Sequence, residues 1–212
     1  MIIAVDGPSA AGKGTLSRRL AAHFGLVHLD TGALYRAVAL AVLRAKGDPG
    51  DPDTCIAAAK ALDRETLDDP EIRSERTAAA ASKLAPIPEV RAVLLSYQRN
   101  FATRPPGEAK GAVLDGRDIG TVVCPDADVK LFVTASAEAR AARRLKELRE
   151  RGIEAISSHV LQDMKERDAR DQARAVAPMV PAQDAIVLDT TDLDANAAFE
   201  KALEMIASRD VA

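Results

Sequence analysis

The feature that most constrains this chain lies near its amino terminus, where an apolar run leads into a glycine-punctuated segment. Residues 2–6 read Ile-Ile-Ala-Val-Asp, and residues 7–15 read Gly-Pro-Ser-Ala-Ala-Gly-Lys-Gly-Thr. Leu16, Leu20 and Phe24 then recur with helical spacing. A strand, a glycine-rich loop and a helix in this order predict an α/β fold, and they disfavour the alternative of a simple turn with a solvated lysine.

The loop has the composition of a phosphate-binding site. Glycines at positions 7 and 12 let several backbone N–H groups point at one centre, and Lys13 adds a positive charge at the start of a helix. These features predict binding of a nucleoside triphosphate by Gly7, Pro8, Ser9, Ala10, Ala11, Gly12, Lys13, Gly14 and Thr15. Ser or Thr usually follows the lysine to meet Mg²⁺; Gly14 stands there, so we expect Thr15 to take that role.

Composition narrows the classes of partner and compartment. A chain of 212 residues that is 47% apolar suits one α/β domain with an insertion. Its net charge of −3 argues against a nucleic-acid or membrane surface. The two cysteines, Cys55 and Cys124, have no metal-ligand spacing, and we find no leader segment or run of 18 apolar residues. We therefore expect a cytoplasmic protein without membrane or nucleic-acid partners.

Strand and helix patterns alternate along most of the chain. After the first strand, compact apolar runs predict strands at 26–29, 112–115, 129–133 and 186–189. Helical periodicity predicts helices at 33–43, 88–101, 137–151 and 195–206. A further helix is predicted to begin near residue 157, with Ser157 or Ser158 as its N-cap. Residues 53–86 lack the alternation of a strand and predict short helices. The expected architecture is a parallel sheet with helices on both faces.

Arginines recur where the carboxyl ends of the strands should gather. They are Arg36, Arg91, Arg117, Arg167, Arg170 and Arg174. Because arginine binds phosphate oxygens with two parallel donors and stays charged, they predict a second, anionic substrate. Arg167, Asp171 and Arg174 share one helical face, which indicates a mobile lid. A solvated, salt-bridged surface helix is the alternative for that segment.

Four separate motifs, in order, resemble those of the bacterial cytidylate kinases, within the nucleoside monophosphate kinases. They occupy residues 7–15, 29–36, 115–121 and 166–171. The resemblance implies a monomeric kinase of the phosphate-loop NTPase fold that transfers the γ-phosphoryl group of ATP to CMP or dCMP with Mg²⁺. It also implies a single kinase domain divided into a core (1–47, 87–150 and 175–212), a monophosphate-binding insertion (48–86) and a lid (151–174). The family's insertion commonly carries short antiparallel strands, but residues 48–86 lack the alternation of β-branched residues, so we expect a mostly helical insertion here.

The same resemblance assigns site residues. The catalytic residues would be Lys13, Arg117, Arg167 and Arg174, and those binding CMP would be Thr31, Arg36, Ser82, Arg91, Arg117, Asp118, Arg167, Asp171 and Arg174. The chemistry agrees for Asp118: a carboxylate only accepts hydrogen bonds, so it suits the 4-amino group of cytosine and repels the 4-oxo group of uracil.

Several residues keep two interpretations. Ser82 reads cytosine or bonds back to its own helix. Asp30 contacts ligand or caps the helix after it. Asp115 orders waters of Mg²⁺ with Thr15 or caps the following turn. Adenine stacking falls to one of Arg140, Arg143 and Arg144, which the sequence does not separate.

Two further expectations concern single positions. His23, His28 and His159 have no carboxylate or serine pattern around them and are expected to be structural or surface residues. Position 10 carries Ala where the family often has Gly, which the loop tolerates if φ is negative there.

Two rival functions remain at this point. An adenylate- or shikimate-type kinase shares the loop and sheet, but Asp118 and the arginines at 167 and 174 favour CMP. A nucleotide-binding switch needs a water-positioning residue for slow hydrolysis, and the sequence indicates none.

Overall fold

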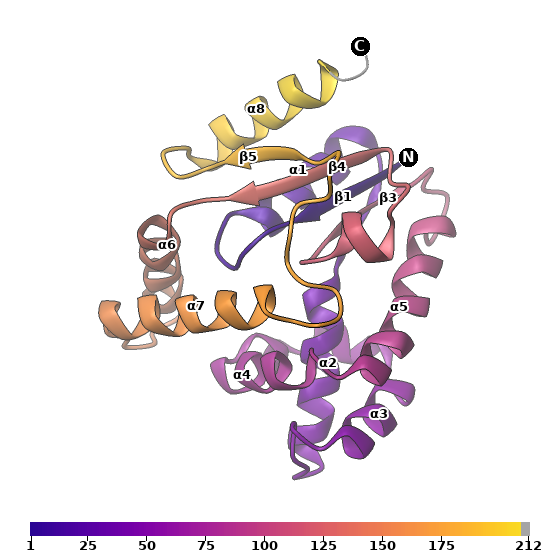
Figure 1. Ribbon diagram of the computed structural model, residues 1–212, viewed down its shortest axis with the longest axis vertical. Coiled ribbons are helices and arrows are strands. Elements are labelled where there is room, and N and C mark those ends of the chain that lie inside the picture. Colours follow the sequence, from indigo (N-terminus) through magenta and orange to yellow (C-terminus); the bar gives the residue numbers. More distant parts are fainter. Residues whose placement is uncertain (209–212) are drawn as a thin grey trace. The chain divides into compact units, whose positions relative to one another are not determined.

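The computed structural model describes residues 1–208 and divides into two compact units. The first unit contains Met1–Leu29 and the chain from Pro105 onward, and the second contains Asp30–Arg104 (Figure 1). Within residues 1–208, no helix combines the length and apolar character that crossing a membrane requires.

The first unit is built on a parallel sheet (Figure 1). Its strands are β1 (Ile2–Asp6), β2 (Val27–Asp30), β3 (Ala112–Asp115), β4 (Val129–Thr134) and β5 (Ile186–Asp189), in the order β2-β3-β1-β4-β5. β1 lies at the centre, paired in parallel with β3 and β4, and β4 pairs in parallel with β5. Strands buried on both faces need continuous apolar runs, which is the pattern that the sequence shows.

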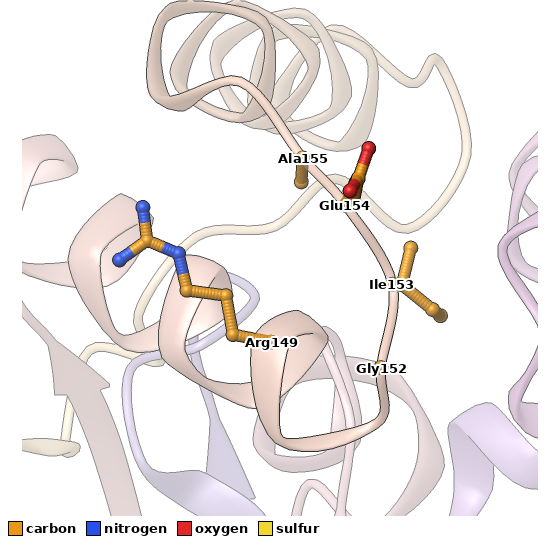
Figure 2. Close-up of a pocket in the computed structure, with 5 residues that line it drawn as sticks. All are labelled: Arg149, Gly152, Ile153, Glu154 and Ala155. Atoms are coloured by element: carbon orange, nitrogen blue, oxygen red, sulfur yellow. The ribbon is translucent and has the colours of Figure 1, made fainter.

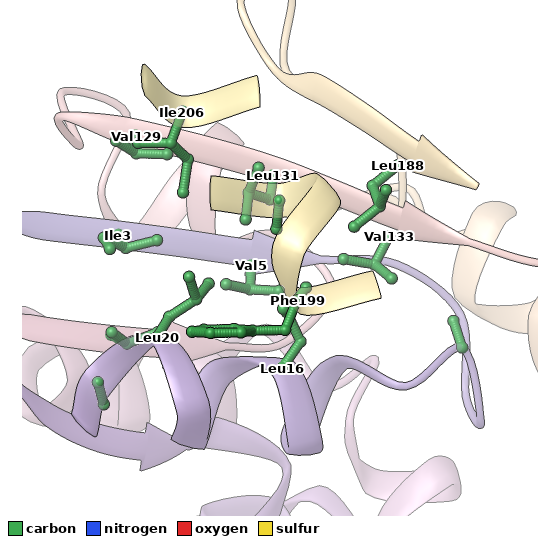
Figure 3. Close-up of a cluster of buried hydrophobic side chains, with 14 residues drawn as sticks. Ile3, Val5, Leu16, Leu20, Val129, Leu131, Val133, Leu188, Phe199 and Ile206 are labelled. Atoms are coloured by element: carbon green, nitrogen blue, oxygen red, sulfur yellow. The ribbon is translucent and has the colours of Figure 1, made fainter. Parts of the chain in front are cut away.

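Two helices cover one face of this sheet. Residues of α1 (Lys13–Phe24) and α8 (Ala195–Ala207) pack with β1, β4 and β5 in one apolar cluster (Figure 3). Ile3 and Val5 of β1, Leu20 of α1 and Phe199 of α8 belong to it. Each fully buried side chain of this size contributes roughly 1.5–3 kcal/mol relative to an exposed one. This packing fixes the strand and helix on either side of the loop at residues 7–12.

The remaining elements of the first unit follow the strand ends. They are a short π-helical turn, η3 (Ile119–Val123), and the helices α6 (Ala137–Glu150) and α7 (Ser157–Gln172). α6 and α7 pack on each other through a small apolar cluster that includes Leu148 and Met164. The turn η3 was not predicted, because five residues are too few to show a helical period.

The second unit is helical. Its elements are α2 (Thr31–Arg44), α3 (Pro52–Lys60), the 3₁₀ turns η1 (Arg64–Asp68) and η2 (Pro70–Arg73), α4 (Glu75–Leu84) and α5 (Pro88–Thr103). Asp51 and Ser74 cap α3 and α4 by accepting hydrogen bonds from Thr54 N and Thr77 N. The described part of residues 48–86 is therefore helical, as its lack of strand alternation indicates.

The fold class predicted from the sequence is confirmed, with five strands in residues 1–208 within a residue or two of the expected positions. One capping prediction is wrong. Ile156 is the N-cap of α7, with no side-chain cap bond, so neither Ser157 nor Ser158 fills that position. The predicted division into core, insertion and lid remains a prediction.

Candidate active site

The loop after β1 has the backbone geometry that its glycines predict. Gly7 has a φ of +137°, and a Cβ there would lie 2.0 Å from the carbonyl oxygen of Val133. Gly12 has a φ of +92° and is the N-cap of α1, with no side-chain cap bond. Both conformations favour glycine. The N–H groups at the start of α1 are therefore available to an anion.

Ala10 departs from expectation. Its φ is +57°, in the left-handed region, whereas a negative φ was the condition for alanine to be tolerated without cost. A Cβ in this region crowds the following carbonyl oxygen, at a cost of roughly 1–2 kcal/mol. The condition is therefore not met, and the loop does not absorb alanine at this position without cost. The alanine therefore stores strain in the phosphate-binding loop.

Two buried side chains from distant segments tether the loop, and sequence reasoning missed both roles. The Thr190 hydroxyl, just after β5, donates to the carbonyl of Ala11 at 3.0 Å. Arg140 of α6 donates to the carbonyl of Ser9 at 3.2 Å and to Asp168 of α7 at 2.6 Å. These bonds fix the carbonyl side of the loop and leave its N–H groups to face a ligand.

The arginines considered for adenine stacking are now distinguished by their partners. Arg140 is buried and bound as just described. Arg143 donates to the hydroxyl of Thr190 at 3.0 Å and to the carbonyl of Leu193 at 3.3 Å. Arg144 pairs at 2.6 Å with the carboxylate of Glu147, whose side chain is 53% exposed.

Lys13 is buried and lies across the loop. Its Nζ donates to the carbonyl oxygen of Pro8 at 2.7 Å. Burial lowers the pKa of Lys13 to about 7, and the charges of Arg117 and Arg167 act in the same direction, against Asp115 and Asp6. A phosphate chain would reverse this balance by adding negative charge beside the ammonium group.

The two residues predicted to meet Mg²⁺ differ in their surroundings. Thr15 is exposed on the first turn of α1, and its hydroxyl lies 3.5 Å from a guanidinium nitrogen of Arg18. Asp115 is buried at the carboxyl end of β3, where its charge acts on Lys13. Oxygen ligands of this kind suit Mg²⁺, which usually keeps several waters and is shared with phosphates. Both the hydroxyl of Thr15 and the carboxylate of Asp115 are oxygen donors of this kind.

His28 was expected to have no carboxylate near it, and this expectation was wrong. Its Nε2 lies 2.6 Å from Oδ2 of Asp115. The pair forms because β2 and β3 are neighbours in the sheet, a fact that strand order, rather than local sequence, determines. His28 therefore orients the carboxylate, and neither alternative considered for Asp115 included this contact.

Three arginines gather around one carboxylate in the first unit. Asp171 of α7 accepts hydrogen bonds from Arg117 Nε at 2.9 Å and from the guanidinium of Arg174. Burial alone would raise the pKa of Asp171, but the charges of Arg117, Arg174 and Arg167 outweigh it and hold the pKa below its ordinary value. Since Arg117 and Arg167 also act on Lys13, the four residues predicted to be catalytic share one region.

Asp118 and its neighbours are held by a residue that sequence reasoning did not assign. The carboxylate of Asp6 accepts hydrogen bonds from the N–H groups of Ile119 and Gly120, both at 2.8 Å. Asp118 itself is buried at the N-cap of η3. In the sequence, the only sign of this role is an aspartate at the end of an apolar strand.

The other predicted CMP-binding residues lie in the second unit. Thr31 is the buried first residue of α2. Asp30 caps this helix by accepting from Ala33 N at 3.1 Å, which is one of its two predicted roles, and its second oxygen pairs with Arg36 at 2.6 Å. Arg36 Nε is buried without a hydrogen-bond partner. Its guanidinium thus retains a donor that a ligand could occupy.

Ser82 lies near the end of α4, and Arg91 lies in the first turn of α5. Arg91 is buried, donates to the carbonyl of Ala85 at 3.2 Å and lies 5.7 Å from the ring centroid of Tyr35. Ala85 comes one residue after α4 ends, one turn beyond Ser82. The Ser82 hydroxyl is buried without a hydrogen-bond partner, so it does not bond back to its helix. Such groups usually have a partner, which favours a ligand-binding role.

A separate cavity of about 330 Å³ lies at the junction of α6 and α7 (Figure 2). Arg149, Gly152, Ile153, Glu154 and Ala155 line it, and it contains none of the residues discussed above. Nothing in its chemistry marks it as part of the nucleotide site.

The parallel sheet, the anion-binding loop after β1 and the buried lysine and arginines define a class, that of nucleotide-binding kinases with a phosphate-binding loop. The chain belongs to the cytidylate kinase family, whose model matches residues 3–208.

Full-length relatives agree with this membership. The chain is 62% identical to a protein named cytidylate kinase from Paramagnetospirillum magneticum, over 98% of both chains. It is 57% identical to one of the same name from Rhodospirillum rubrum, over 99% of this chain and 98% of the relative. Among solved structures, an uncharacterized protein from Eubacterium ventriosum covers 98% of this chain and 99% of its own, with a TM-score of 0.58 and 15% identity. That likeness supports the fold alone.

Proposed function

We propose that the chain is a (d)CMP kinase, which transfers the γ-phosphoryl group of ATP to CMP or dCMP and gives ADP with CDP or dCDP. The observation that carries the proposal is the family match over residues 3–208, together with a phosphate-binding loop whose lysine and glycines have the required geometry. The names of the relatives support the same acceptor.

The donor is held mainly by backbone groups in this proposal. The N–H groups of residues 7–15 and the amino end of α1 bind the phosphates of ATP, and Lys13 leaves the carbonyl of Pro8 to contact the β- and γ-phosphates. Mg²⁺ supplies further neutralisation of phosphate charge when it is bound. Asp115, oriented by His28, and Thr15 are the residues proposed to hold it or its waters.

The acceptor needs no general base, because the phosphate of CMP is already ionised at neutral pH. One of its oxygens attacks the γ-phosphorus, the bond from that phosphorus to the β–γ bridging oxygen breaks, and ADP leaves with the electron pair. Arg167 and Arg174 neutralise charge on the moving group, and Arg36, Arg117 and Arg174 hold the acceptor phosphate. Catalysis therefore comes from alignment and charge stabilisation.

Recognition of the base is assigned to Asp118, Ser82 and Arg91, and recognition of the sugar to Arg167 and Asp171. The buried, unbonded hydroxyl of Ser82 supports its part in this set. Thr31 completes the residues proposed to bind CMP. The segments 48–86 and 151–174 are proposed to act as the monophosphate-binding insertion and the lid.

The remaining parts of the proposal concern setting and assembly. We propose a cytoplasmic monomer with small-molecule substrates. We also propose that it has no nucleic-acid or membrane partner, which a net charge of −3 supports.

A coupled assay of ADP release with each of CMP, dCMP, UMP and AMP, with and without Mg²⁺, tests the function. We expect ADP formation that depends on Mg²⁺ and on CMP or dCMP, with weaker use of UMP and AMP. ADP release that ignores CMP would indicate a hydrolytic switch, and a preference for AMP would indicate another kinase; either result contradicts the proposal.

A further inference from the structure

Asp6 is the last residue of the central strand β1, and its side chain is only 4% exposed. One carboxylate oxygen accepts from Ile119 N and the other from Gly120 N, each at 2.8 Å. A buried carboxylate that binds two backbone N–H groups with separate oxygens fixes both the position and the direction of the segment that carries them.

These two bonds complete a bracket around the residues proposed to contact CMP. On the near side, Gly116 N donates to the carbonyl of Val5 at 2.9 Å and continues the ladder between β1 and β3. On the far side, Asp6 holds Ile119 and Gly120. Only residues 117 and 118 lie between the two anchors. Successive residues of one strand, Val5 and Asp6, therefore hold Arg117 and Asp118 from both ends.

The turn η3 depends on the same carboxylate for its cap. The first N–H groups of a helical turn lack partners within the turn, and the residue before it often supplies one. The side chain of Asp118, at that position, does not cap η3. Asp6 caps it instead, from another strand.

Close packing keeps Gly120 within reach of Asp6. A Cβ at Gly120 would lie 3.2 Å from Cδ and 3.3 Å from Cγ of Lys130, and 3.5 Å from Oδ2 of Asp6. Lys130 is itself buried and pairs with Asp184, so its stem cannot move away freely. A larger residue at position 120 would press the turn away from β1.

The carboxylate of Asp6 stays ionised although it is buried. Burial raises the pKa of Asp6 to about 6, with a further rise from Asp118, while the two N–H donors and Lys13 oppose it. At neutral pH the group is still mostly ionised. An amide at this position would accept only one of the two N–H groups and would point its own NH₂ at the other.

We infer that Asp6 is a positioning residue for base selectivity, because it holds the segment that presents Asp118 and Arg117. The inference rests on the proposed function, in which Asp118 distinguishes cytosine from uracil. Asp6 does not contact substrate in this account. It acts by fixing the direction from which the Asp118 carboxylate approaches the base.

The test compares kcat/KM for CMP with kcat/KM for UMP in the full-length protein and in Asp6→Asn. A misplacement of about 1 Å costs up to ~100-fold, so we expect the CMP-over-UMP ratio to fall roughly 10- to 100-fold. ATP affinity, measured by calorimetry without acceptor, should change much less. Asp118→Ala serves as the reference for complete loss of selectivity.

The matched control is Asp128→Asn. Asp128 accepts from Ile2 N at 2.6 Å at the opposite end of β1, so it is also a carboxylate that binds a strand N–H. Its replacement should lower thermal stability without changing the CMP-over-UMP ratio. Gly120→Ala disturbs the same turn from the Lys130 side and should reduce the ratio, which keeps the test decisive if Asp6→Asn does not fold.

The outcomes separate the inference from the function. An unchanged ratio in Asp6→Asn and Gly120→Ala, in a protein that prefers CMP, would overturn the role of Asp6 alone. A parallel loss for both acceptors would also overturn it, since that result is general loosening. A wild-type protein without preference for CMP would instead contradict the proposed function on which the inference depends.

Discussion

The phosphate-binding loop and the arginine cluster around Asp171 both lie in the first unit, yet they are built in opposite ways. The loop is one contiguous stretch, and its anion-binding groups are backbone N–H groups positioned by glycines and by the amino end of α1. The cluster draws Arg117 from the segment after β3 and Asp171 and Arg174 from α7 and its end. It consists of charged side chains that are buried or half-buried.

This difference determines what each region needs when no substrate is bound. Backbone dipoles carry no net charge, so the empty loop needs no counter-ion to be stable. Its one charged side chain, Lys13, has a lowered pKa. Guanidinium groups stay charged, so the cluster needs a permanent anion. Asp171 supplies that anion. We therefore expect Lys13 to gain a proton when ATP binds to the loop. When CMP binds, we expect the arginines of the cluster to exchange the carboxylate of Asp171 for the phosphate of CMP.

The largest expected effect comes from removing one charge from each region. Lys13→Ala and Arg174→Ala should each lower kcat by about 10²–10³-fold or more, because each removes a charge that stabilises the transferring phosphoryl group. Lys13→Ala should also weaken ATP binding, whereas Arg174→Ala should raise KM for CMP. Circular dichroism checks that both variants fold. Near-normal turnover in either would break the assigned roles.

The next prediction concerns Asp171, the carboxylate that balances the charge of the arginines. Asp171→Asn leaves three arginines without their carboxylate and should lower the free energy of unfolding by about 3–5 kcal/mol at neutral pH. Because the folded pKa of Asp171 lies below its unfolded value, this stability is present above the unfolded pKa and is lost as pH falls through the folded pKa. Chemical denaturation measures it.

Added phosphate sharpens this test. Inorganic phosphate should restore part of the stability of Asp171→Asn by replacing the missing negative charge. The control is Asp168→Asn, which breaks another buried pair, with Arg140, outside the cluster. Phosphate should stabilise Asp168→Asn only as much as it stabilises the parent protein through the loop at residues 7–15. Equal recovery of both variants would contradict the idea of an exchangeable anion.

A smaller effect concerns the protonation of the loop. With a pKa of about 7, Lys13 is mostly neutral at pH 8 in the free protein, and bound phosphates should raise that pKa. ATP binding at pH 8 should therefore take up close to one proton, and much less at pH 6. Calorimetry in buffers of different ionisation enthalpy measures the uptake. Lys13→Met provides the comparison and should show none.

The smallest effect is a local relief of strain. Ala10 has a positive φ, which Gly adopts without crowding, so Ala10→Gly should raise the free energy of unfolding by about 1 kcal/mol. Turnover should stay close to that of the parent protein. A loss of stability would show that the left-handed conformation at this position costs nothing.

How far the sequence predicted each region follows from how each is built. The loop, its glycines and Lys13 were predictable because one short segment contains all of them between a strand and a helix. The sequence predicted that Arg167, Asp171 and Arg174 share one helical face, but it did not predict that Arg117 pairs with Asp171. Thr190, Asp6 and His28 act on residues far away in the chain, and strand order determines those contacts.

Two failed expectations have the same physical origin. The φ of Ala10 depends on how the whole loop curls, and the carboxylate beside His28 depends on which strand lies next to β2. The local sequence predicts neither the φ of Ala10 nor the partner of His28. For Ser82 the sequence left two interpretations open, and its buried hydroxyl without a hydrogen-bond partner removes the one in which it bonds back to its helix.

The most direct test of the account is a crystal structure of the full chain with Mg²⁺, a non-hydrolysable ATP analogue and CMP. The account predicts the analogue's phosphates on the N–H groups of residues 7–15 with Lys13 Nζ moved from Pro8 onto them. It predicts the CMP phosphate on Arg117 and Arg174, and the cytosine amino group on Asp118. A structure with CMP away from these side chains would contradict it.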